Sequence, residues 1–435
     1  MAEGPVVPVY VLDDATPKHR AMGAASRWWL HHSLKALDEE LRARGSRLIF
    51  RRGRTADELG KVAEALDTKR VHALHHYEPW WRNAEKSVAH HLDLVLHDGN
   101  YLLPPGTVRS GSGEPYKIFT PFSRALFQHM PPSKPLPAPD EISAPKSWPD
   151  SDKLADWALL PTKPNWAGGF GKEWTPGEAG AAERLDDFEP KAADYDEARN
   201  FPSIEGVSRL SPHLHFGEIS PASVWHGTPD KHRGISAFRR ELVWRDYAQN
   251  VICAWPDYGR ANAKDNFDAL PWRDHLGEAA DDLAAWKQGR TGYPIVDAGM
   301  RQLWVSGWIH NRVRMIVASF LIKHLLIDWR VGEQWFWDTL VDADYGNNAV
   351  NWQWTAGSGA DANMFVRILA PLVQSPKFDA ADYIREWVPE LAKLDDQDIH
   401  DPAGRGRRPA SYPEPIVDHR AARERALAAF EKIRR

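Results

Sequence analysis

The first part of the chain alternates short apolar runs with helical patterns. Residues 5–15 form an apolar run that ends in two acids, as a buried parallel strand does before its loop. Helical periodicity follows over 26–44 and stops at Gly45, a common C-terminal signal. The pattern continues with the strands SRLIFRRG, RVHALHH and LDLVLHD and the helices near 55–66 and 81–91. This alternation predicts an α/β domain with a Rossmann-like parallel sheet.

The later pattern is different. Residues 131–180 are dense in proline, glycine and serine and predict an interdomain linker. From about 190 to 395 the periodicity is helical, with almost no strand-like alternation. We therefore expect an α/β domain over 1–130, a linker over 131–189 and an all-α domain over 190–435.

Composition narrows the class of protein. The 435 residues include 26% charged side chains and no apolar run near the roughly 20 residues of a membrane span. The N-terminus lacks the features of a signal peptide. The single cysteine, Cys253, allows no internal disulfide and no CxxC zinc pair. We expect a soluble, cytoplasmic, monomeric protein without a metal site.

Charge and tryptophan content leave two questions open. The net charge is −5, but 301–330 holds five Arg or Lys against the single acid Asp328. Charge alone favours a solvated helix face there over a nucleic-acid surface. The chain also has 21 tryptophans. Most must be core residues, although base stacking or electron transfer would also explain such an excess.

The motif GVSRLSPHLHFGEISP contains two Ser-Pro pairs, each typical of a helix start. Ser208, Arg209 and Ser211 would bring two hydroxyls, a guanidinium and free helix-start amides together. Such a group suits a phosphate. Simple capping by Ser211 and Ser220 is the alternative, and both interpretations stay open.

Two helical motifs carry a similar set of side chains. In ELVWRDY, the spacing places Glu241, Trp244 and Arg245 on one helical face. This face would either line a cleft or hold an intrahelical Glu241–Arg245 ion pair packed on a core tryptophan. In GWIHNRVRM, the spacing again predicts one face, made of Trp308, Asn311, Arg312 and Met315. Asparagine can hydrogen-bond a base and arginine can hold a phosphate. The repetition is more informative than either helix alone.

The segment DADYGNNAVNWQW combines two acids, three asparagines and two tryptophans. Asp342 and Asp344 need partners if they are buried, and Arg314 is a candidate. Residues 346–348 predict a turn-prone break.

These motifs resemble the flavin-binding domain of the DNA photolyase/cryptochrome family. YDEARNFPSIEGVSRLSPHL, ELVWRDY, GRTGYPIVDAGMRQLWVSGWIHNRVRMIVASFLIKHLLIDWR and NWQW match its motifs in order and spacing. The preceding domain, with YKIFTPFSRALF, also fits. The likeness is greatest to microbial cyclobutane pyrimidine dimer photolyases, and it implies an enzyme that binds FAD and damaged DNA.

The resemblance implies a role for each matching residue. Residues expected to hold FAD are Tyr195, Val207, Ser208, Arg209, Leu210, Ser211, Arg314, Asp342, Asp344 and Asn348. Arg314 would pair with Asp342, and Asn348 would face flavin N5. An electron relay would run through Trp272, Trp329 and Trp352. Residues expected to bind DNA are Arg199, Glu241, Trp244, Arg245, Asn311, Arg312, Met315, Trp354, Arg367 and Gln374. Of these, Glu241 would also act with Asn348 in catalysis.

The implied activity is light-driven repair. Excited, reduced FAD would donate an electron to a flipped-out dimer, whose cyclobutane ring splits before the electron returns. Relatives that repair (6-4) photoproducts carry a second histidine after His310, where this chain has Asn311, which favours cyclobutane dimers. A cryptochrome-like photoreceptor without repair is the alternative. A nicotinamide-dependent flavin oxidoreductase has no support, because no GxGxxG follows a strand.

The chain departs from the family at its start. Its members usually begin with a strand and an Arg-rich loop before the strand found here at 5–15. Either the start lies upstream or the sheet lacks its first strand. That loop helps to form the antenna site, so a second chromophore (folate, deazaflavin or flavin) is expected without a fixed identity.

Overall fold

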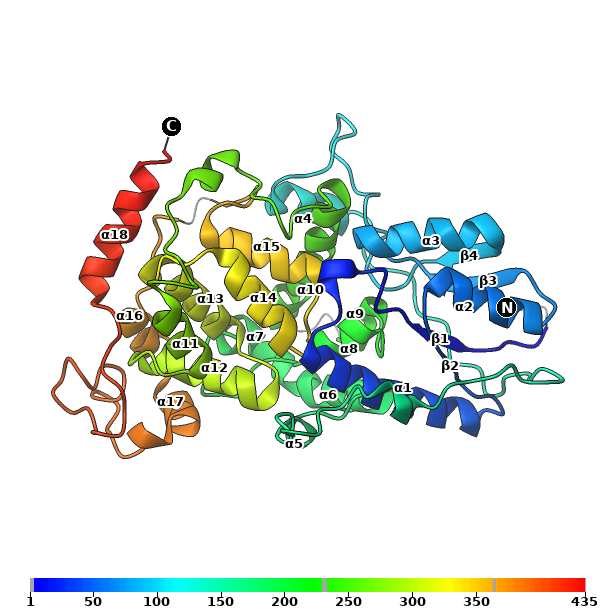
Figure 1. Cartoon of the computed structure of the whole chain (residues 1–435), viewed down its shortest axis with the longest axis horizontal. Helices are drawn as coiled ribbons and strands as arrows, with labels where there is room; N and C mark the ends of the chain where they lie inside the picture. The colour runs from blue at the N-terminus through cyan, green and yellow to red at the C-terminus, as the bar shows by residue number, and fades with distance from the viewer. Residues whose placement is uncertain (1–3, 229–232, 363–364, 435) are drawn as a thin grey trace.

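The computed structural model describes residues 4–228, 233–362 and 365–434. A small α/β region and a larger helical region lie side by side along the longest axis of the molecule (Figure 1). The predicted fold class is therefore confirmed.

The strands occur where the sequence predicts them, but they do not form one sheet. Strand β1 (Val9–Leu12) pairs in parallel with β2 (Ile49–Arg52), and β3 (Arg70–Leu74) pairs in parallel with β4 (Asp93–His97). No strand joins the two pairs within the described residues. The expectation of a single sheet is thus corrected to two parallel pairs, since each strand finds only one partner among the described residues.

The three predicted N-terminal helices are present within a few residues of their expected bounds, as α1 (Ala24–Ala43), α2 (Thr55–Ala65) and α3 (Pro79–His91). A further helix, α4 (Phe119–Phe127), was not predicted. One stripe of α1, which includes Trp29, Leu30 and Leu34, is buried. Gly45 follows the helix with a φ of +81°, the left-handed conformation that ends many helices.

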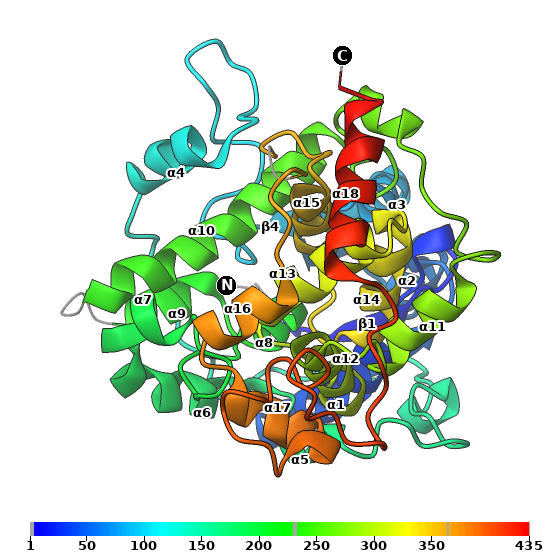
Figure 2. The same cartoon turned by 90° about the vertical axis from the view of Figure 1, so that its left-hand side faces the viewer.

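The second half is helical, as predicted, and packs around α10 and α12 to α15. Its helices are α5 (Phe170–Glu173), α6 (Glu178–Phe188), α7 (Tyr195–Ala198), α8 (Ser211–Phe216), α9 (Pro221–Gly227), α10 (Arg233–Ala254), α11 (Ala280–Gln288), α12 (Pro294–Ser306), α13 (Asn311–Ser319), α14 (Trp329–Thr339), α15 (Tyr345–Ala356), α16 (Pro371–Lys377), α17 (Ala381–Trp387) and α18 (His419–Glu431). Figure 2 shows the last helix, α18, lying across α13 to α15 at one end of the molecule.

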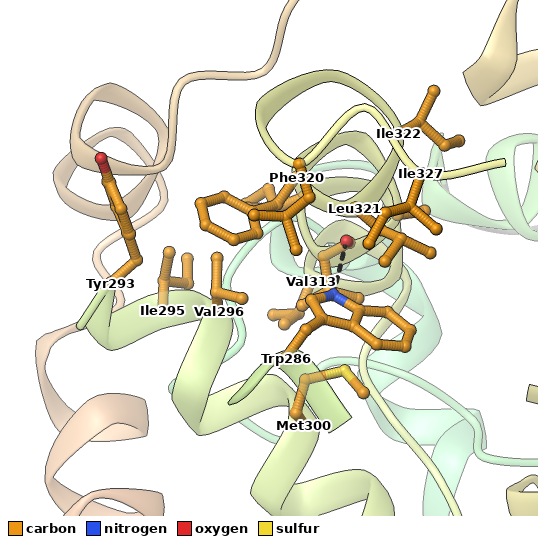
Figure 3. Packing of buried hydrophobic residues seen from close by; sticks show 14 of the residues in the cluster. Trp286, Tyr293, Ile295, Val296, Met300, Val313, Phe320, Leu321, Ile322 and Ile327 are labelled. Carbon is orange, nitrogen blue, oxygen red and sulfur yellow. Dashed lines mark hydrogen bonds between the residues drawn. The ribbon is translucent and has the colours of Figure 1, made fainter. Parts of the chain in front are cut away.

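The largest core lies inside this helical part. Trp286 of α11 is fully buried among Met300, Val313 and Leu321 (Figure 3). Its indole N–H donates to the Val317 carbonyl at 3.0 Å. A buried indole is stable when its one polar atom finds an acceptor, and the ring then contributes a large apolar area. This core also contains Trp329 and Trp352 and so fixes two residues of the predicted relay.

The predicted linker is packed rather than free. Trp157, Phe170 and Trp174 are buried, and α6 begins inside the predicted range of 131–189. The Trp174 N–H donates to the Ser306 carbonyl at 2.7 Å, and its ring meets that of Trp29 at 5.4 Å. The segment therefore connects α1 to α12, while the domain boundaries themselves stay predictions.

Among the described residues, no helix has the length and apolar character that crossing a bilayer requires.

Candidate functional site

The two acids of DADYGNNAVNWQW lie at the start of α15. Asp344 caps this helix by accepting from the N–H and the side-chain amide of Asn347, at 2.7 and 2.8 Å. Residues 346–348 therefore form the first turn of the helix, and the predicted break is wrong. Burial acts to raise the pKa of Asp344, but His215, Arg245 and the helix-start N–H outweigh it and lower the pKa to about 2. This carboxylate stays ionised.

Asp342 joins three elements. Its Oδ2 atom accepts from the Arg314 guanidinium at 2.8 Å and from the Ser211 hydroxyl at 2.7 Å. The predicted Arg314–Asp342 pair is thus present. Ser211 does not cap α8, because its hydroxyl is bound to Asp342, and that alternative is wrong for this residue. Ser220 does cap α9. The Asp342 Oδ1 atom is buried without a hydrogen-bond partner among the described residues, so the site offers an acceptor to a ligand.

The loop that leads into α8 presents free backbone N–H groups to a ligand, while the guanidinium of Arg209 is already paired. Arg209, at a φ of +51°, is bound by Glu173 at 3.1 Å and by Glu205 at 2.8 Å. Its charge is therefore balanced by two acids, and its predicted contact with the FAD phosphates stays a prediction. Within the described chain, no acceptor is found for the backbone N–H groups of Val207, Ser208 and Arg209. Adjacent free amides suit an anion, so the phosphate interpretation keeps this part of its basis.

Tyr195 and Leu210 are core residues in this structure. Tyr195 packs edge-on against Phe238 at 5.4 Å, and burial raises its pKa. Leu210 is almost fully buried in the same cluster. Both lie beside the loop that the phosphate interpretation uses, and their contact with FAD stays a prediction.

Glu241 on α10 pairs with Arg199, which follows α7, and not with Arg245. The Arg245 guanidinium donates to the carbonyls of Asn100 and Leu214. The alternative of an intrahelical Glu241–Arg245 ion pair is therefore wrong. Arg245 instead connects α10 to the N-terminal region, which gives no support to its predicted contact with DNA.

Five of the predicted DNA-binding residues gather near the start of α13. Burial lowers the pKa of Arg312, and the positive charges of Arg199 and Arg367 lower it further, whereas Glu241 opposes them. Asn311 is exposed beside them, and Arg312 donates to the Asn200 side chain at 2.8 Å. Like charges placed this close repel one another, so an anion that binds there would be stabilised.

His310 lies beside these arginines and was not predicted as a site residue. Burial and the charges of Arg312, Arg314, Arg209 and Arg199 lower its pKa to about 3. The neutral ring accepts from the Arg312 N–H at 3.3 Å as the cap of α13, and its buried Nε2 atom has no partner among the described residues.

Trp308 does not share the face of Asn311, Arg312 and Met315, because α12 ends at Ser306 and α13 begins at Asn311. It is buried under Arg209, 4.9 Å from its guanidinium, in the cluster with Phe170. That part of the predicted face is wrong. Met315 and Gln374 are half-buried, and their predicted contacts with DNA stay untested.

Trp244 and Trp354 lie on α10 and α15, which pack against each other. Both rings are half-buried. Trp244 stacks on Phe119 with centroids 3.4 Å apart and planes within 4°. Phe119 was not predicted, because it lies 125 positions before Trp244 and its motif alone does not indicate which ring it meets.

The predicted relay residues share one cluster. Trp329 and Trp352 are buried in the main core, and half-buried Trp272 packs against it. The Trp329 N–H donates to Asn262 at 2.9 Å. Gly332 lets α14 approach Trp352, since a Cβ there would lie 2.2 Å from the ring.

Asn348 is bound by a residue that the sequence analysis missed. Its amide nitrogen donates to both the main-chain carbonyl and the side chain of Glu333, each at 2.9 Å. An acid inside the tryptophan-rich stretch WRVGEQWFW was the available signal.

A second candidate site is a surface cavity of about 720 Å³ between α11, α12, α14 and α17. The rings of Trp304 and Trp335 both line it and are nearly parallel, with planes within 4° and centroids 6.1 Å apart. Lys287 and Arg301 also line it. The Trp335 N–H is buried without a partner among the described residues. The site was missed because these tryptophans come from different helices.

No group of three His, Cys, Asp or Glu residues that could hold a metal ion occurs within the described ranges.

Comparisons with known proteins cover both regions of the chain. The family model described as DNA photolyase matches residues 1–140, and the one described as the FAD binding domain of DNA photolyase matches residues 238–432. A deoxyribodipyrimidine photo-lyase of Agrobacterium fabrum is 47% identical over 99% of this chain and 93% of its own length.

Solved structures agree with these matches. A bacterial class III photolyase from Agrobacterium tumefaciens superposes with a TM-score of 0.92 at 46% identity, over 99% of this chain and 92% of that one. An archaeal photolyase from Sulfolobus tokodaii, described with two FAD molecules, gives a TM-score of 0.80 at 27% identity, over 99% and 94%.

Proposed function

Because the chain belongs to the DNA photolyase family, as its motifs predicted, we propose that it repairs cyclobutane pyrimidine dimers in DNA by light-driven electron transfer. The observation that carries this proposal is the positive region around Arg312, where Arg199 and Arg367 gather beside Glu241. Such a region attracts the phosphates that flank a lesion.

The residues present fit FAD. Asp342 offers a buried, unpaired oxygen, and free amides at 207–209 lie beside Ser211, which Asp342 binds. We infer that Ser208, Ser211 and these amides hold the phosphates, while Asp342, Asp344 and Arg314 hold the remainder. When bound and reduced, FAD supplies the electron that light makes available to the dimer.

The chain itself binds and orients the lesion. The arginines would hold the DNA backbone, and the half-buried rings of Trp244 and Trp354 would stack on the flipped-out bases. Glu241 and Asn311 would accept and donate hydrogen bonds at base edges. Phe119 supports one ring face of Trp244 and so leaves the other for the substrate.

Repair of a dimer-bearing oligonucleotide under blue light, after chemical reduction of the flavin, tests the proposal. We expect the dimer absorbance change to require light and reduced FAD. A protein that binds FAD but repairs nothing would instead support the alternative of a photoreceptor without repair.

Replacing Arg312 tests the carrying observation. Arg312→Gln should weaken binding to damaged DNA and lower the salt slope by about one counterion. Arg385→Gln is the matched control, since Arg385 pairs with Asp382 and Asp396 on the surface. An equal effect of both changes would contradict the assigned DNA surface.

We propose that the Trp304–Trp335 cavity holds the second chromophore. The two indole planes are nearly parallel, so a flat heteroaromatic ring would stack on one of these indoles at the cavity. Lys287 suits an acidic tail, whereas Arg301 is paired with Glu390. Folate, deazaflavin and flavin all meet this description, and the absorption spectrum of denatured protein distinguishes them.

We also propose that the protein acts in the cytoplasm as a monomer. Sedimentation of the purified chain at two concentrations tests the oligomeric state.

A further inference from the structure

Arg20 reaches from the N-terminal region into the site and meets Glu333. The short turn Lys18–Arg20 precedes α1, and its Arg20 Nη1 atom lies 2.7 Å from Glu333 Oε1 on α14. Only 5% of the Arg20 side chain is exposed, and none of that of Glu333. Burying two charges removes their hydration, so a pair of this kind is weak evidence for stability alone. Its partners indicate another role.

Arg20 is held in one position. Its Nη2 atom donates to the Gly259 carbonyl at 2.8 Å, and its guanidinium lies 5.6 Å from the Trp337 ring centroid. The chain beside it is fixed as well, because the Trp337 N–H donates to the Ala21 carbonyl at 2.8 Å. Gly23 permits this close approach, since a Cβ there would lie 2.1 Å from the Trp337 carbonyl oxygen.

The carboxylate oxygen that binds Arg20 also binds Asn348. Glu333 Oε1 accepts from Asn348 Nδ2 at 2.9 Å, and the Glu333 carbonyl accepts from the same nitrogen. No described residue donates to Asn348 Oδ1. The amide therefore turns its nitrogen toward α14 and keeps its oxygen, an acceptor, for a ligand.

We propose that Arg20 is a positioning residue that fixes the hydrogen-bonding direction of Asn348 through Glu333. The proposal rests on the proposed function, in which Asn348 faces N5 of the flavin. An ionised carboxylate can only accept, so it must bind the NH₂ group of the amide. A protonated carboxyl can donate, and the amide would then turn to present its NH₂ group to the flavin.

Arg20 favours the ionised form of Glu333, which it meets at 2.7 Å. Burial raises the pKa of Glu333 above its ordinary value, and the hydrogen bond and charge of Arg20, with the Asn348 amide, limit this rise. Tyr345 also lies near Glu333. Burial raises the pKa of Tyr345, so this side chain stays uncharged and does not replace Arg20. Without Arg20, the carboxyl would bind a proton rather than stay a buried, unpaired anion.

The direction of the amide has a consequence for the flavin. An acceptor near N5 stabilises flavin that carries a proton on N5, which is the reduced form, whereas a donor stabilises the oxidised form. Arg20 would therefore favour the reduced cofactor from a distance, by acting on Glu333.

The test is the midpoint potential of the bound flavin in the full-length holoprotein. For Arg20→Met we expect at least a tenfold fall in the equilibrium constant for reduction, a shift of about −30 mV for a two-electron couple. Arg20→Lys keeps the charge and should retain the wild-type potential. Arg27→Met is the matched control, because Arg27 pairs with Asp14 away from Glu333 and should not change the potential.

A double variant keeps the proposal testable if Arg20→Met alone does not fold. Arg20→Met with Glu333→Gln removes both charges and introduces an NH₂ donor that can bind Asn348 Oδ1 and turn the amide, so it should have the same lowered potential. A wild-type potential in either variant, or an equal fall in Arg20→Lys, would overturn the proposal. A wild-type protein without bound flavin would instead refute the proposed function, and this role with it.

Discussion

Two pairs of tryptophans in the helical region use the same side chain in different ways. Trp329 and Trp352 are buried in the main core, and the Trp329 N–H has an acceptor in Asn262. Trp304 and Trp335 lie at the surface cavity, where Trp304 is 48% exposed and the Trp335 N–H has no partner among the described residues.

The difference separates packing from binding. A core indole has neighbours on both faces and a satisfied polar atom, which is what a dense interior requires. At the cavity, the exposed ring of Trp304 and the unpaired N–H of Trp335 leave apolar area and a donor unused, which is costly unless a ligand covers them. Residue type alone does not distinguish the two cases; the arrangement of partners does.

The largest expected effect is that of Trp329→Phe in the buried pair. If the buried pair relays electrons, photoreduction of oxidised FAD should be lost, while repair by chemically reduced enzyme continues. Trp286→Phe is the control, because Trp286 is equally buried in the same core but lies outside the relay. Loss of photoreduction in both variants, or of repair in Trp329→Phe, would contradict the relay.

Stability distinguishes the two kinds of tryptophan next. Trp286→Ala should lower the free energy of unfolding by about 3–5 kcal/mol, because it leaves a cavity and breaks the bond to Val317. Trp304→Ala should change it by no more than about 0.5 kcal/mol, as expected for an exposed side chain. Urea titration measures both, and similar losses would show that Trp304 is a packing residue.

The cavity pair is tested by its ligand. Trp335→Ala should weaken binding of the second chromophore by about 1–3 kcal/mol, the usual value of one stacked ring. The FAD content of the same preparation is the internal control and should not change. If the second chromophore remains bound with full affinity, the cavity does not hold it.

The last prediction concerns the indole N–H of Trp329, which donates to Asn262. Asn262→Leu removes the acceptor of the Trp329 N–H and should cost about 1–3 kcal/mol of unfolding free energy. Adding Trp329→Phe removes the donor as well and should recover part of this loss. Additive losses would show that the hydrogen bond contributes nothing.

The sequence predicted the elements more completely than their partners. The four strands and α1 to α3 occur within a few residues of the predicted ranges, because periodicity is local. Two of the alternatives left open by the sequence, the Glu241–Arg245 pair and the Ser211 cap, are wrong because tertiary neighbours compete for the same atoms. Arg199 pairs with Glu241, and Asp342 accepts from Ser211.

By itself, the sequence determined the family, the α/β and helical regions, and the Arg314–Asp342 pair that the motifs implied. Only the tertiary structure brought Arg20 to Glu333, and Trp304 to Trp335. These pairs join residues whose spacing in the chain carries no periodic signal. Which atoms of distant elements meet depends on how whole helices pack, and packing is a property of the complete fold.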